Sequence, residues 1–272
     1  MNRPLVFLDT ELTALESAPH LVEVGAIRVV DGEAVHSFSE LVRPEVPVDP
    51  RATEVHGLST EELGQADSAG LVLARFLDWL DEDDWLVAHN MPADANALGF
   101  ELARAELEPP DNALFDSLKL VRKGLPDAPD HRLETLIEHL ELDVETTHRA
   151  LADAVACWQV TEAALEEIAD GEPVTETLVL QFAGLSGTLA QWLPAPPSRR
   201  RQAVRRLDGA RREERVVTLI YGGDGQQPVP IPVLPRLLYG RDKRGYLEGE
   251  CQKTGALKTY RLDRVQRIVE SS

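Results

Sequence analysis

Apolar and polar positions near the start of the chain follow the pattern of β-strands. Residues 5–8 form an unbroken apolar run that stops at an aspartate, which is typical of a strand buried on both faces. Residues 21–30 and 34–42 flank the dipeptide Asp31-Gly32, and this dipeptide between two apolar stretches is a strong signal for a tight hairpin turn. The pattern therefore predicts three antiparallel strands.

From residue 69 onward, helix-like and strand-like segments alternate. Apolar residues recur at helical spacing in four segments, and two short apolar runs between them have the length of strands. This alternation after a set of antiparallel strands favours an α/β fold in which helices flank a mixed sheet. The expected helices cover residues 69–80, 93–107, 133–140 and about 148–168, and the expected strands cover residues 85–88 and 113–118.

The character of the sequence changes after residue 172. Residues 175–192 are compatible with one more helix, and the proline-rich stretch 194–198 is typical of a stiff linker. We therefore expect a first domain over residues 1–172, a helix and Pro/Arg-rich linker over 173–202, and a small β-rich domain over 203–272. In that last domain an arginine-rich helix precedes short β-like segments at residues 216–221, 237–239, 246–251 and 258–262.

Charge divides the chain at the same place. Residues 1–172 contain 11 Lys or Arg and 37 Asp or Glu, which gives a net charge of −26; residues 173–272 contain 17 and 10, which gives +7. Eight arginines fall within residues 199–215. Most of the acidic excess is explained by solubility alone, whereas a compact basic module indicates contact with phosphates.

Composition favours a soluble cytoplasmic protein without a membrane partner. Hydrophobic residues make up 43% of the 272 residues and charged residues 28%, and no stretch approaches the roughly 20 apolar residues of a membrane span. The first residues lack the pattern of a secretory signal. Cys157 and Cys251 lie far apart and lack zinc-ligand spacing, so neither a disulfide nor a structural zinc site is expected.

Several carboxylates stand where a metal site could form. Asp9 and Glu11 are two residues apart at the expected end of a strand, so both side chains point to one face. Paired oxygen ligands of this kind suit Mg²⁺ or Mn²⁺. Asp94 follows Pro92, which suits the first turn of a helix, and a carboxylate there can also serve only the helix dipole.

His148 and Asp153 can share a site only if the last long helix begins between them. Five residues on an ideal helix separate two side chains by about 140°, so His148 must precede the helix while Asp153 lies one turn inside it. Thr146 and Thr147 are natural capping residues and support a start there. Considered alone, His148 would be an exposed histidine near a helix cap.

The order and spacing of these residues resemble the DEDDh (DnaQ-like) 3′–5′ exonuclease family over about residues 4–169. The matching segments are Asp9-Thr10-Glu11, Glu54-Val55-His56-Gly57-Leu58-Ser59, His89-Asn90-x-x-x-Asp94 and His148-Arg149-Ala150-Leu151-Ala152-Asp153. The resemblance implies a ribonuclease H-like fold. It also implies two divalent metal ions, Mg²⁺ or Mn²⁺, held by Asp9, Glu11, Asp94 and Asp153, with His148 as the general base.

By the same resemblance, Glu11, Leu12 and His56 would help to seat the 3′-terminal nucleotide. Asn90 would belong to this substrate side and order the loop that leads to the second aspartate. The sequence departs from the family at Leu12, where Thr is frequent, and at Ala93, where Phe is usual. These departures concern substrate seating and packing, so they leave the preference for DNA or RNA open but do not change the expected reaction.

Four further segments lie in the C-terminal region, namely Val204–Tyr221, Pro230–Leu234, Gly245–Gly249 and Lys258–Val265. Together they resemble a WYL domain over about residues 203–270, with Gly245 in place of the Trp that names the family. The resemblance implies a small Sm-like or SH3-like β-barrel that binds nucleic acid or a nucleotide-type ligand. It points to Tyr246, Arg261 and Arg264 as ligand contacts. The alternative is that Tyr246 is a core aromatic residue and that the arginines form surface ion pairs.

Together these features predict a metal-dependent 3′–5′ exonuclease that acts on single-stranded ends, with DNA favoured, in DNA repair or end processing. The same chemistry on RNA is the nearest alternative. A ligand-sensing WYL regulator with a vestigial nuclease domain is an alternative of another class, and the presence of all five expected catalytic positions argues against it. A proofreading subunit bound to a polymerase ranks lower, because no polymerase motif is evident.

Overall fold

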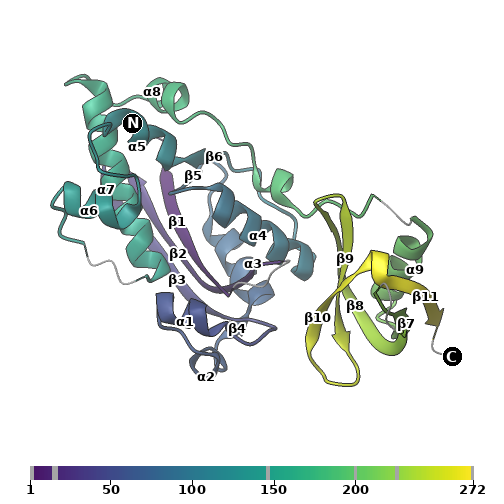
Figure 1. Ribbon diagram of the computed structural model, residues 1–272. Coiled ribbons are helices and arrows are strands. Elements are labelled where there is room, and N and C mark those ends of the chain that lie inside the picture. The colour runs from purple at the N-terminus through teal and green to yellow at the C-terminus, as the bar shows by residue number, and fades with distance from the viewer. Residues whose placement is uncertain (1–2, 14–17, 145–147, 199–200, 224–226, 271–272) are drawn as a thin grey trace. The chain divides into compact units, whose positions relative to one another are not determined.

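The computed structural model describes residues 3–13, 18–144, 148–198, 201–223 and 227–270. By packing, the chain divides into two units, Met1–Leu193 and Pro194–Ser272, and each is described by itself (Figure 1). Within the described ranges, no helix has both the length and the apolar character needed to cross a membrane.

The first unit is built on a six-stranded mixed sheet in the order β4-β3-β2-β1-β5-β6. The three first strands pair antiparallel, and the parallel strands β5 and β6 extend the sheet from β1, which confirms the expected mixed α/β sheet. The strands are β1 (Leu5–Thr13), β2 (His20–Val30), β3 (Glu33–Arg43), β4 (Asp67–Ser68), β5 (Trp85–Ala88) and β6 (Leu114–Asp116).

Helices cover both faces of this sheet (Figure 1). The four expected helices are present, and the structure adds three that sequence periodicity did not reveal, namely α1, α2 and α5. The segment expected as a strand through residue 118 ends at Asp116, whose side chain accepts a hydrogen bond from the Leu118 amide and starts α5. The helices are α1 (Pro50–His56), α2 (Thr60–Leu63), α3 (Ala69–Trp79), α4 (Pro92–Ala105), α5 (Ser117–Gly124), α6 (Leu133–His139) and α7 (Ala150–Ala169).

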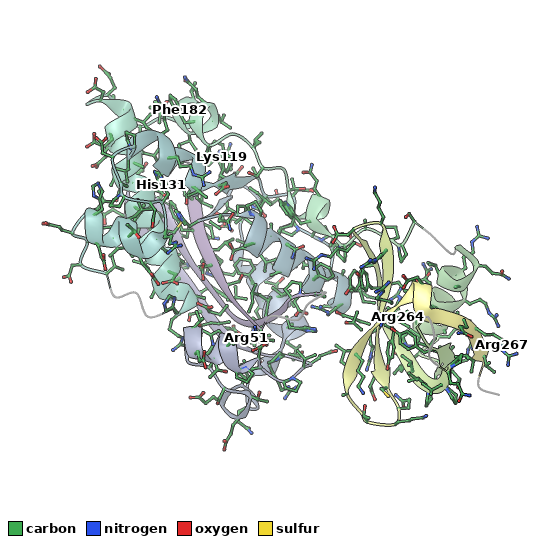
Figure 2. All side chains as sticks on the ribbon, in the orientation of Figure 1. Arg51, Lys119, His131, Phe182, Arg264 and Arg267 are labelled. Atoms are coloured by element: carbon green, nitrogen blue, oxygen red, sulfur yellow. The ribbon has the colours of Figure 1, made fainter. Side chains whose placement is uncertain are left out.

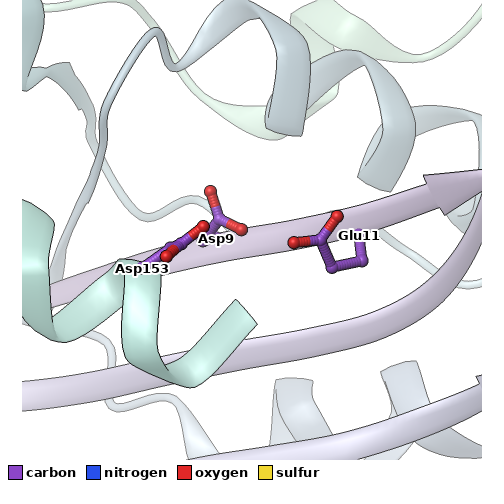
Figure 3. Close-up of side chains that lie close together, drawn as sticks. All are labelled: Asp9, Glu11 and Asp153. Atoms are coloured by element: carbon purple, nitrogen blue, oxygen red, sulfur yellow. The ribbon is translucent and has the colours of Figure 1, made fainter. Parts of the chain in front are cut away.

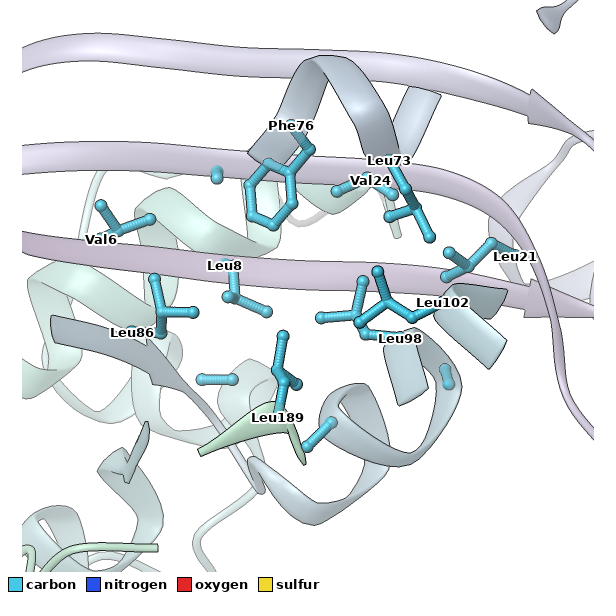
Figure 4. Packing of buried hydrophobic residues seen from close by; sticks show 14 of the residues in the cluster. Val6, Leu8, Leu21, Val24, Leu73, Phe76, Leu86, Leu98, Leu102 and Leu189 are labelled. Atoms are coloured by element: carbon cyan, nitrogen blue, oxygen red, sulfur yellow. The ribbon is translucent and has the colours of Figure 1, made fainter. Parts of the chain in front are cut away.

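Strand β1 is buried on both faces, as its unbroken apolar run predicts. Val6 and Leu8 pack into a core with α3 and α4, where Figure 4 shows them beside Leu86 and Leu98. Leu5 and Phe7 face the opposite side and pack into a second core that includes residues of α5 and α7. Because side chains alternate along a strand, Thr10 points toward α4, while Asp9 and Glu11 point toward α7.

The segment expected as one helix over residues 175–192 is instead two short elements. Helix α8 (Glu176–Phe182) and the 3-10 helix η1 (Leu189–Trp192) are separated by Gly184 and Gly187, which have φ angles of 65° and 89°. Left-handed backbone of this kind ends a helix. η1 packs directly on α4: a Cβ at Gly99 would lie 2.3 Å from the Trp192 carbonyl oxygen, and Leu189 is part of the core.

The second unit combines α9 (Arg201–Arg212) with a five-stranded antiparallel sheet in the order β10-β9-β8-β7-β11. Leu207 and Ala210 of α9 pack against the apolar face of this sheet. Strands β10 and β11 lie at its two ends, so closure into the expected barrel is not seen. The strands are β7 (Val217–Tyr221), β8 (Val229–Arg241), β9 (Arg244–Cys251), β10 (Leu257–Arg261) and β11 (Val265–Glu270), with the 3-10 helix η2 (Leu262–Arg264) before β11.

Candidate metal centre

Asp9 and Glu11 lie inside β1 and share one face of the sheet (Figure 3). The strand does not end at Asp9, as its apolar run suggested, but continues to Thr13 because β2 pairs with it over its whole length. Asp9 stands opposite Gly25 and Glu11 opposite Glu23, and the register shifts just after Glu11. A bulge at this point adds local twist to the strand.

Asp153 reaches this pair from the first turn of α7 (Figure 3). The helix can approach because β2 has a glycine at the contact: a Cβ on Gly25 would lie 2.1 Å from the backbone nitrogen of Leu151. One carboxylate oxygen each from Asp9, Glu11 and Asp153 lies within 4.8 Å of the others. A strand and a helix far apart in sequence thus bring three of the predicted ligands together.

The positive charge near the three carboxylates only partly compensates for their burial and repulsion: Arg149 acts to lower the pKa of Glu11, but this is the smallest of the influences on it. Burial and then repulsion by Asp94 raise the pKa of Asp9 well above its usual value. Burial, followed by repulsion from Asp153, raises the pKa of Glu11 to about 8, and burial also raises that of Asp153. In addition, Asp153 Oδ1 is buried and has no hydrogen-bond partner among the described residues. A set of close, hard oxygen donors with an unsatisfied atom fits a divalent cation such as Mg²⁺ or Mn²⁺.

Asp94 lies next to this group but outside it. It occupies the first turn of α4, is 5% exposed, and accepts a hydrogen bond of 2.7 Å from Thr10 Oγ1. Burial raises its pKa to about 7, and the Thr10 hydrogen bond opposes that rise. Among the charged groups, Asp94 acts most strongly on Asp9. The structure therefore holds the fourth predicted ligand beside the first without placing it among the three.

His148 precedes α7, and Asp153 lies in the first turn of that helix, as a shared site requires. His148 has a φ of 45°, Arg149 is the N-cap, and the Asp153 amide bonds to the Arg149 carbonyl. His148 Nε2 lies 3.1 Å from an oxygen of Glu134. The expected caps Thr146 and Thr147 fall outside the described residues. A cavity of about 230 Å³ opens beside the site and is lined by Arg132, Leu133, Glu134, His148 and Asp153.

Of the residues expected on the substrate side, Glu11 and Leu12 belong to β1, His56 lies beside the Leu12 backbone, and Asn90 lies in the loop before α4. His56 ends α1 and is buried; its Nδ1 accepts a hydrogen bond from the Leu58 amide, and burial lowers its pKa while the neighbouring Leu12 backbone raises it. Asn90 has a φ of 71°, and its backbone N–H donates a hydrogen bond to Asp116 Oδ1, so this residue orders the loop before α4.

Three residues of the site were missed by sequence reasoning. Glu23 and Arg149 form a bidentate ion pair beside the carboxylates, and Thr10 binds Asp94. Only Thr10 had a signal in the sequence, because the residue between two ligands on a strand must face the opposite layer. The contact between Glu23 and Arg149 spans 126 positions and depends on how α7 docks.

In the second unit, two of the three expected ligand contacts are neighbours. Tyr246 stands opposite Arg261 across β9 and β10. The Tyr246 ring stacks on Tyr239 at 5.2 Å, and Arg261 is held by Asp263 with contacts of 3.1 and 2.6 Å. Arg264 lies in η2 and is exposed; Figure 2 labels it together with Arg267 of β11.

Known proteins match both units. The RNase_T family of exonucleases matches residues 6–161, and the WYL domain matches residues 202–270, in the order expected from the sequence. A PolC-type DNA polymerase III from Oceanobacillus iheyensis is 30% identical over 167 residues, which cover 60% of this chain but only 12% of that protein. The chain thus spans about an eighth of the length of this curated relative.

Solved structures share the fold of the first unit. Exonuclease X, in complex with 5′ overhanging duplex DNA, is 24% identical with a TM-score of 0.50, over 66% of this chain and 99% of the other. The nuclease domain of 3′hExo, a DEDDh family member bound to rAMP, is 17% identical with a TM-score of 0.54, over 64% of this chain and 96% of the other. Together, family match, fold and acidic cluster indicate a nuclease that uses divalent metal. The chain belongs to the exonuclease family and carries a WYL domain after its nuclease domain.

Proposed function

We propose that this protein is a metal-dependent 3′–5′ exonuclease that hydrolyses single-stranded nucleic-acid ends, with DNA as the preferred substrate. The observation that carries the proposal is the convergence of Asp9, Glu11 and Asp153, whose oxygens lie within 4.8 Å and whose pKa values are raised by burial and by repulsion from nearby carboxylates. Such a group is unfavourable in a folded protein unless a cation is bound there. It therefore has a functional explanation rather than a structural one.

The residues of the site would have two roles, metal binding and proton transfer. Asp9, Glu11 and Asp153 would hold two divalent ions, and Asp94, which Thr10 binds and which acts electrostatically on Asp9, would be the fourth ligand. When bound, such ions activate a water and stabilise the oxygens of an in-line displacement at phosphorus. His148, which precedes α7, would accept the proton of that water as a general base.

The substrate end would rest on the side of the site away from His148. Glu11, the Leu12 backbone and His56 lie together at the end of β1, where they would hold the sugar and base of the 3′-terminal nucleotide. Asn90 would act indirectly, through the loop that it orders. We propose that the strand enters by its 3′ end, because the site resembles that of the DEDDh exonucleases.

DNA is favoured because similar curated proteins include PolC-type DNA polymerases and one similar structure holds duplex DNA. RNA is the second candidate, because another similar structure holds rAMP. We propose that the basic second unit holds the phosphates of longer strands, through Tyr246, Arg261 and Arg264. Repair or end processing in the cytoplasm would use both properties. A nucleotide-type ligand that regulates the nuclease is the alternative role for this unit.

A panel of 5′-labelled single- and double-stranded DNA and RNA, with Mg²⁺ and with Mn²⁺, tests the proposal. We expect a ladder of products shortened one nucleotide at a time from the 3′ end of single-stranded DNA, and its disappearance when a chelator is added. A strand blocked by a 3′-phosphorothioate linkage serves as the control. Products released from the 5′ end, or internal cuts, would contradict the assigned direction.

A further inference from the structure

Glu23 is a buried carboxylate beside the metal centre to which the proposed reaction gives no role. It lies on β2, is 2% exposed, and stands directly opposite Glu11 in the β1–β2 register. A fourth carboxylate here adds repulsion, since Glu23 raises the pKa of Asp9, Glu11 and Asp153 alike, in each case less than burial does. A buried acid that opposes its neighbours in this way needs a compensating contact.

That contact is the start of α7. Arg149 Nε lies 3.0 and 3.2 Å from the two Glu23 oxygens, and Arg149 Nη2 lies 2.8 Å from Oε1. The Ala150 amide donates to Glu23 Oε2 at 3.1 Å. Ala150 is the first residue of α7, and its amide has no partner within the helix. A single carboxylate therefore binds both the N-cap side chain and the first free amide of the helix.

A second contact two residues along β2 completes the attachment. Gly25 leaves room for the backbone of Ala150 and Leu151, which a Cβ would meet at 2.2 and 2.1 Å. Glu23 pairs with Glu11 and Gly25 pairs with Asp9 in the β1–β2 register. The two residues of β2 that contact α7 are therefore the direct neighbours of the two ligands on β1. The first turn of α7 carries Asp153, and the residue before its N-cap is His148.

We propose that Glu23 and Arg149 are positioning residues that hold the first turn of α7 on β2 and thereby set the spacing of Asp153 and His148 from Asp9 and Glu11. The proposal rests on the proposed function only for its effect on cleavage; its effect on metal binding stands alone. The pair is neutral as a whole, so it attaches the helix without adding net charge next to the carboxylates. Residues that support metal ligands in this way typically change metal affinity by about 10- to 100-fold when mutated.

The test is a set of four variants assayed for Mn²⁺ binding by electron paramagnetic resonance in the absence of nucleic acid. Glu23→Gln removes the ion pair but keeps an acceptor for the Ala150 amide. Arg149→Lys keeps the charge but loses the two-pronged geometry. Glu23→Gln combined with Arg149→Met removes both charges. Arg75→Met is the matched control, because Arg75 Nε binds both oxygens of Glu40 at 3.0 and 3.1 Å, joining α3 to β3 in the same unit.

We expect Mn²⁺ affinity to fall by about tenfold in Glu23→Gln, in Arg149→Lys and in the double variant, and to stay unchanged in Arg75→Met. On single-stranded DNA, kcat should fall more than KM changes. If Arg149 instead contacts the substrate, KM rises while Mn²⁺ binding without nucleic acid is unaffected, which overturns the proposal. Recovery of wild-type affinity in the double variant, or full affinity in Arg149→Lys, would show a purely electrostatic effect and also overturn it.

Failure of this inference can be told apart from failure of the proposed function. If the wild type degrades DNA and the variants match it in metal affinity and kcat, the positioning role is wrong and the nuclease stands. If no nucleic acid is degraded but the variants bind Mn²⁺ about tenfold more weakly, the positioning role stands and the exonuclease assignment fails. Urea unfolding checks that each variant is folded, and Arg149→Lys, the most conservative change, decides the matter if Glu23→Gln does not fold.

Discussion

The metal centre of the first unit and the arginines of the second unit differ in how far their charges are paired. In the first unit, Asp9, Glu11 and Asp153 converge, and burial together with repulsion from nearby carboxylates raises their pKa values. In the second unit, several arginines already have an acid close by in the sequence or across the sheet. These pairs are Arg211 and Arg212 with Asp208, Arg215 with Glu213, Arg236 with Glu250, and Arg261 with Asp263.

The contrast shows why net charge is a poor guide to a binding surface. Residues 173–272 contain 17 Lys or Arg, yet several of these arginines lie in partly exposed ion pairs, which contribute little to stability and offer less to a phosphate. Arg264 and Arg267 are exposed, and neither has an acidic partner among the described residues. Individual charged groups that are not fully compensated indicate a binding site better than net charge does. They are acidic in the first unit and basic in the second.

The largest expected effect comes from removing one of the converging carboxylates. Asp9→Asn or Asp153→Asn should lower the cleavage rate by about 10³-fold or more, because metal stabilisation of the transition state contributes several kcal/mol. In chelator, the same variants should melt at a higher temperature than the wild type, because repulsion is relieved. Initial rates and thermal unfolding measure the two effects. Asp263→Asn in the second unit is the control, and undiminished cleavage by Asp153→Asn would refute the ligand assignment.

His148→Ala tests whether the first unit separates metal binding from proton transfer. We expect the rate to fall by roughly 10²- to 10⁴-fold, because the proton acceptor is lost, while Mn²⁺ affinity persists. Raising the pH should restore part of the rate by supplying hydroxide. Rates measured from pH 6 to pH 9 with a matched variant of the exposed His139, also to Ala, provide the comparison. A full-speed His148→Ala enzyme would mean that another group accepts the proton.

The pH dependence of stability between pH 8 and 5 should differ between the two units. The pKa of Glu11 is raised to about 8, so between its ordinary value of 4.5 and about 8 the folded state binds a proton that the unfolded state does not. Without metal, lowering the pH from 8 to 5 should therefore stabilise the wild type by about 2 kcal/mol relative to Glu11→Gln.

Asp263 behaves in the reverse sense, because its hydrogen bond with Arg261 lowers its pKa below 3.8. Its contribution is present above pH 3.8 and is lost as the pH falls through the lowered pKa, so Asp263→Asn should show no such change between pH 8 and 5. Urea unfolding in chelator at several pH values measures both. If the difference in free energy of unfolding between the wild type and Glu11→Gln does not change with pH, the charge of Glu11 does not destabilise the fold.

The smallest expected effect distinguishes paired from unpaired arginines in the second unit. Combining Arg264→Gln with Arg267→Gln should weaken binding to a long single strand and reduce the log–log salt slope by roughly 0.7 for each lost phosphate contact. Arg261→Gln should change the slope less, because Asp263 already neutralises that charge. Binding constants at several salt concentrations measure the slopes. If all the slopes coincide, the second unit does not hold phosphates, and the ligand-sensing role is favoured.

Sequence patterns predicted what depends on local periodicity. The hairpin of β2 and β3 turns at Asp31-Gly32 as expected, and strand β5 matches its apolar run. Asp9 and Glu11 fall on one face by strand alternation, and the predicted helix start separates His148 from Asp153. The two glycines that divide residues 175–192 were visible in the sequence, but their left-handed angles were not.

Strand β8 was only partly predicted, because its prolines argue against a central strand. Pro230 and Pro232 are tolerated because they pair with β7 before the pairing with β9 begins at Val233. Pro235 lies at the register shift in the ladder with β9. The different starting points of the two β8 pairings and the docking of Glu23 against α7 cannot be predicted from a linear pattern. Each depends on how elements far apart in the chain meet.

The packing of η1 on α4 limits how this nuclease can be recombined with other modules. Leu189 is part of the core, and Gly99 has no side chain at the point where it meets the Trp192 carbonyl. A gene fusion joined near residue 172, where the sequence composition changes, would remove η1 from α4 and expose apolar surface. A junction placed after Leu193 keeps it. The segment needed for a stable nuclease domain therefore extends beyond its catalytic motifs. In fusions that exchange the WYL domain, the junction should follow Leu193.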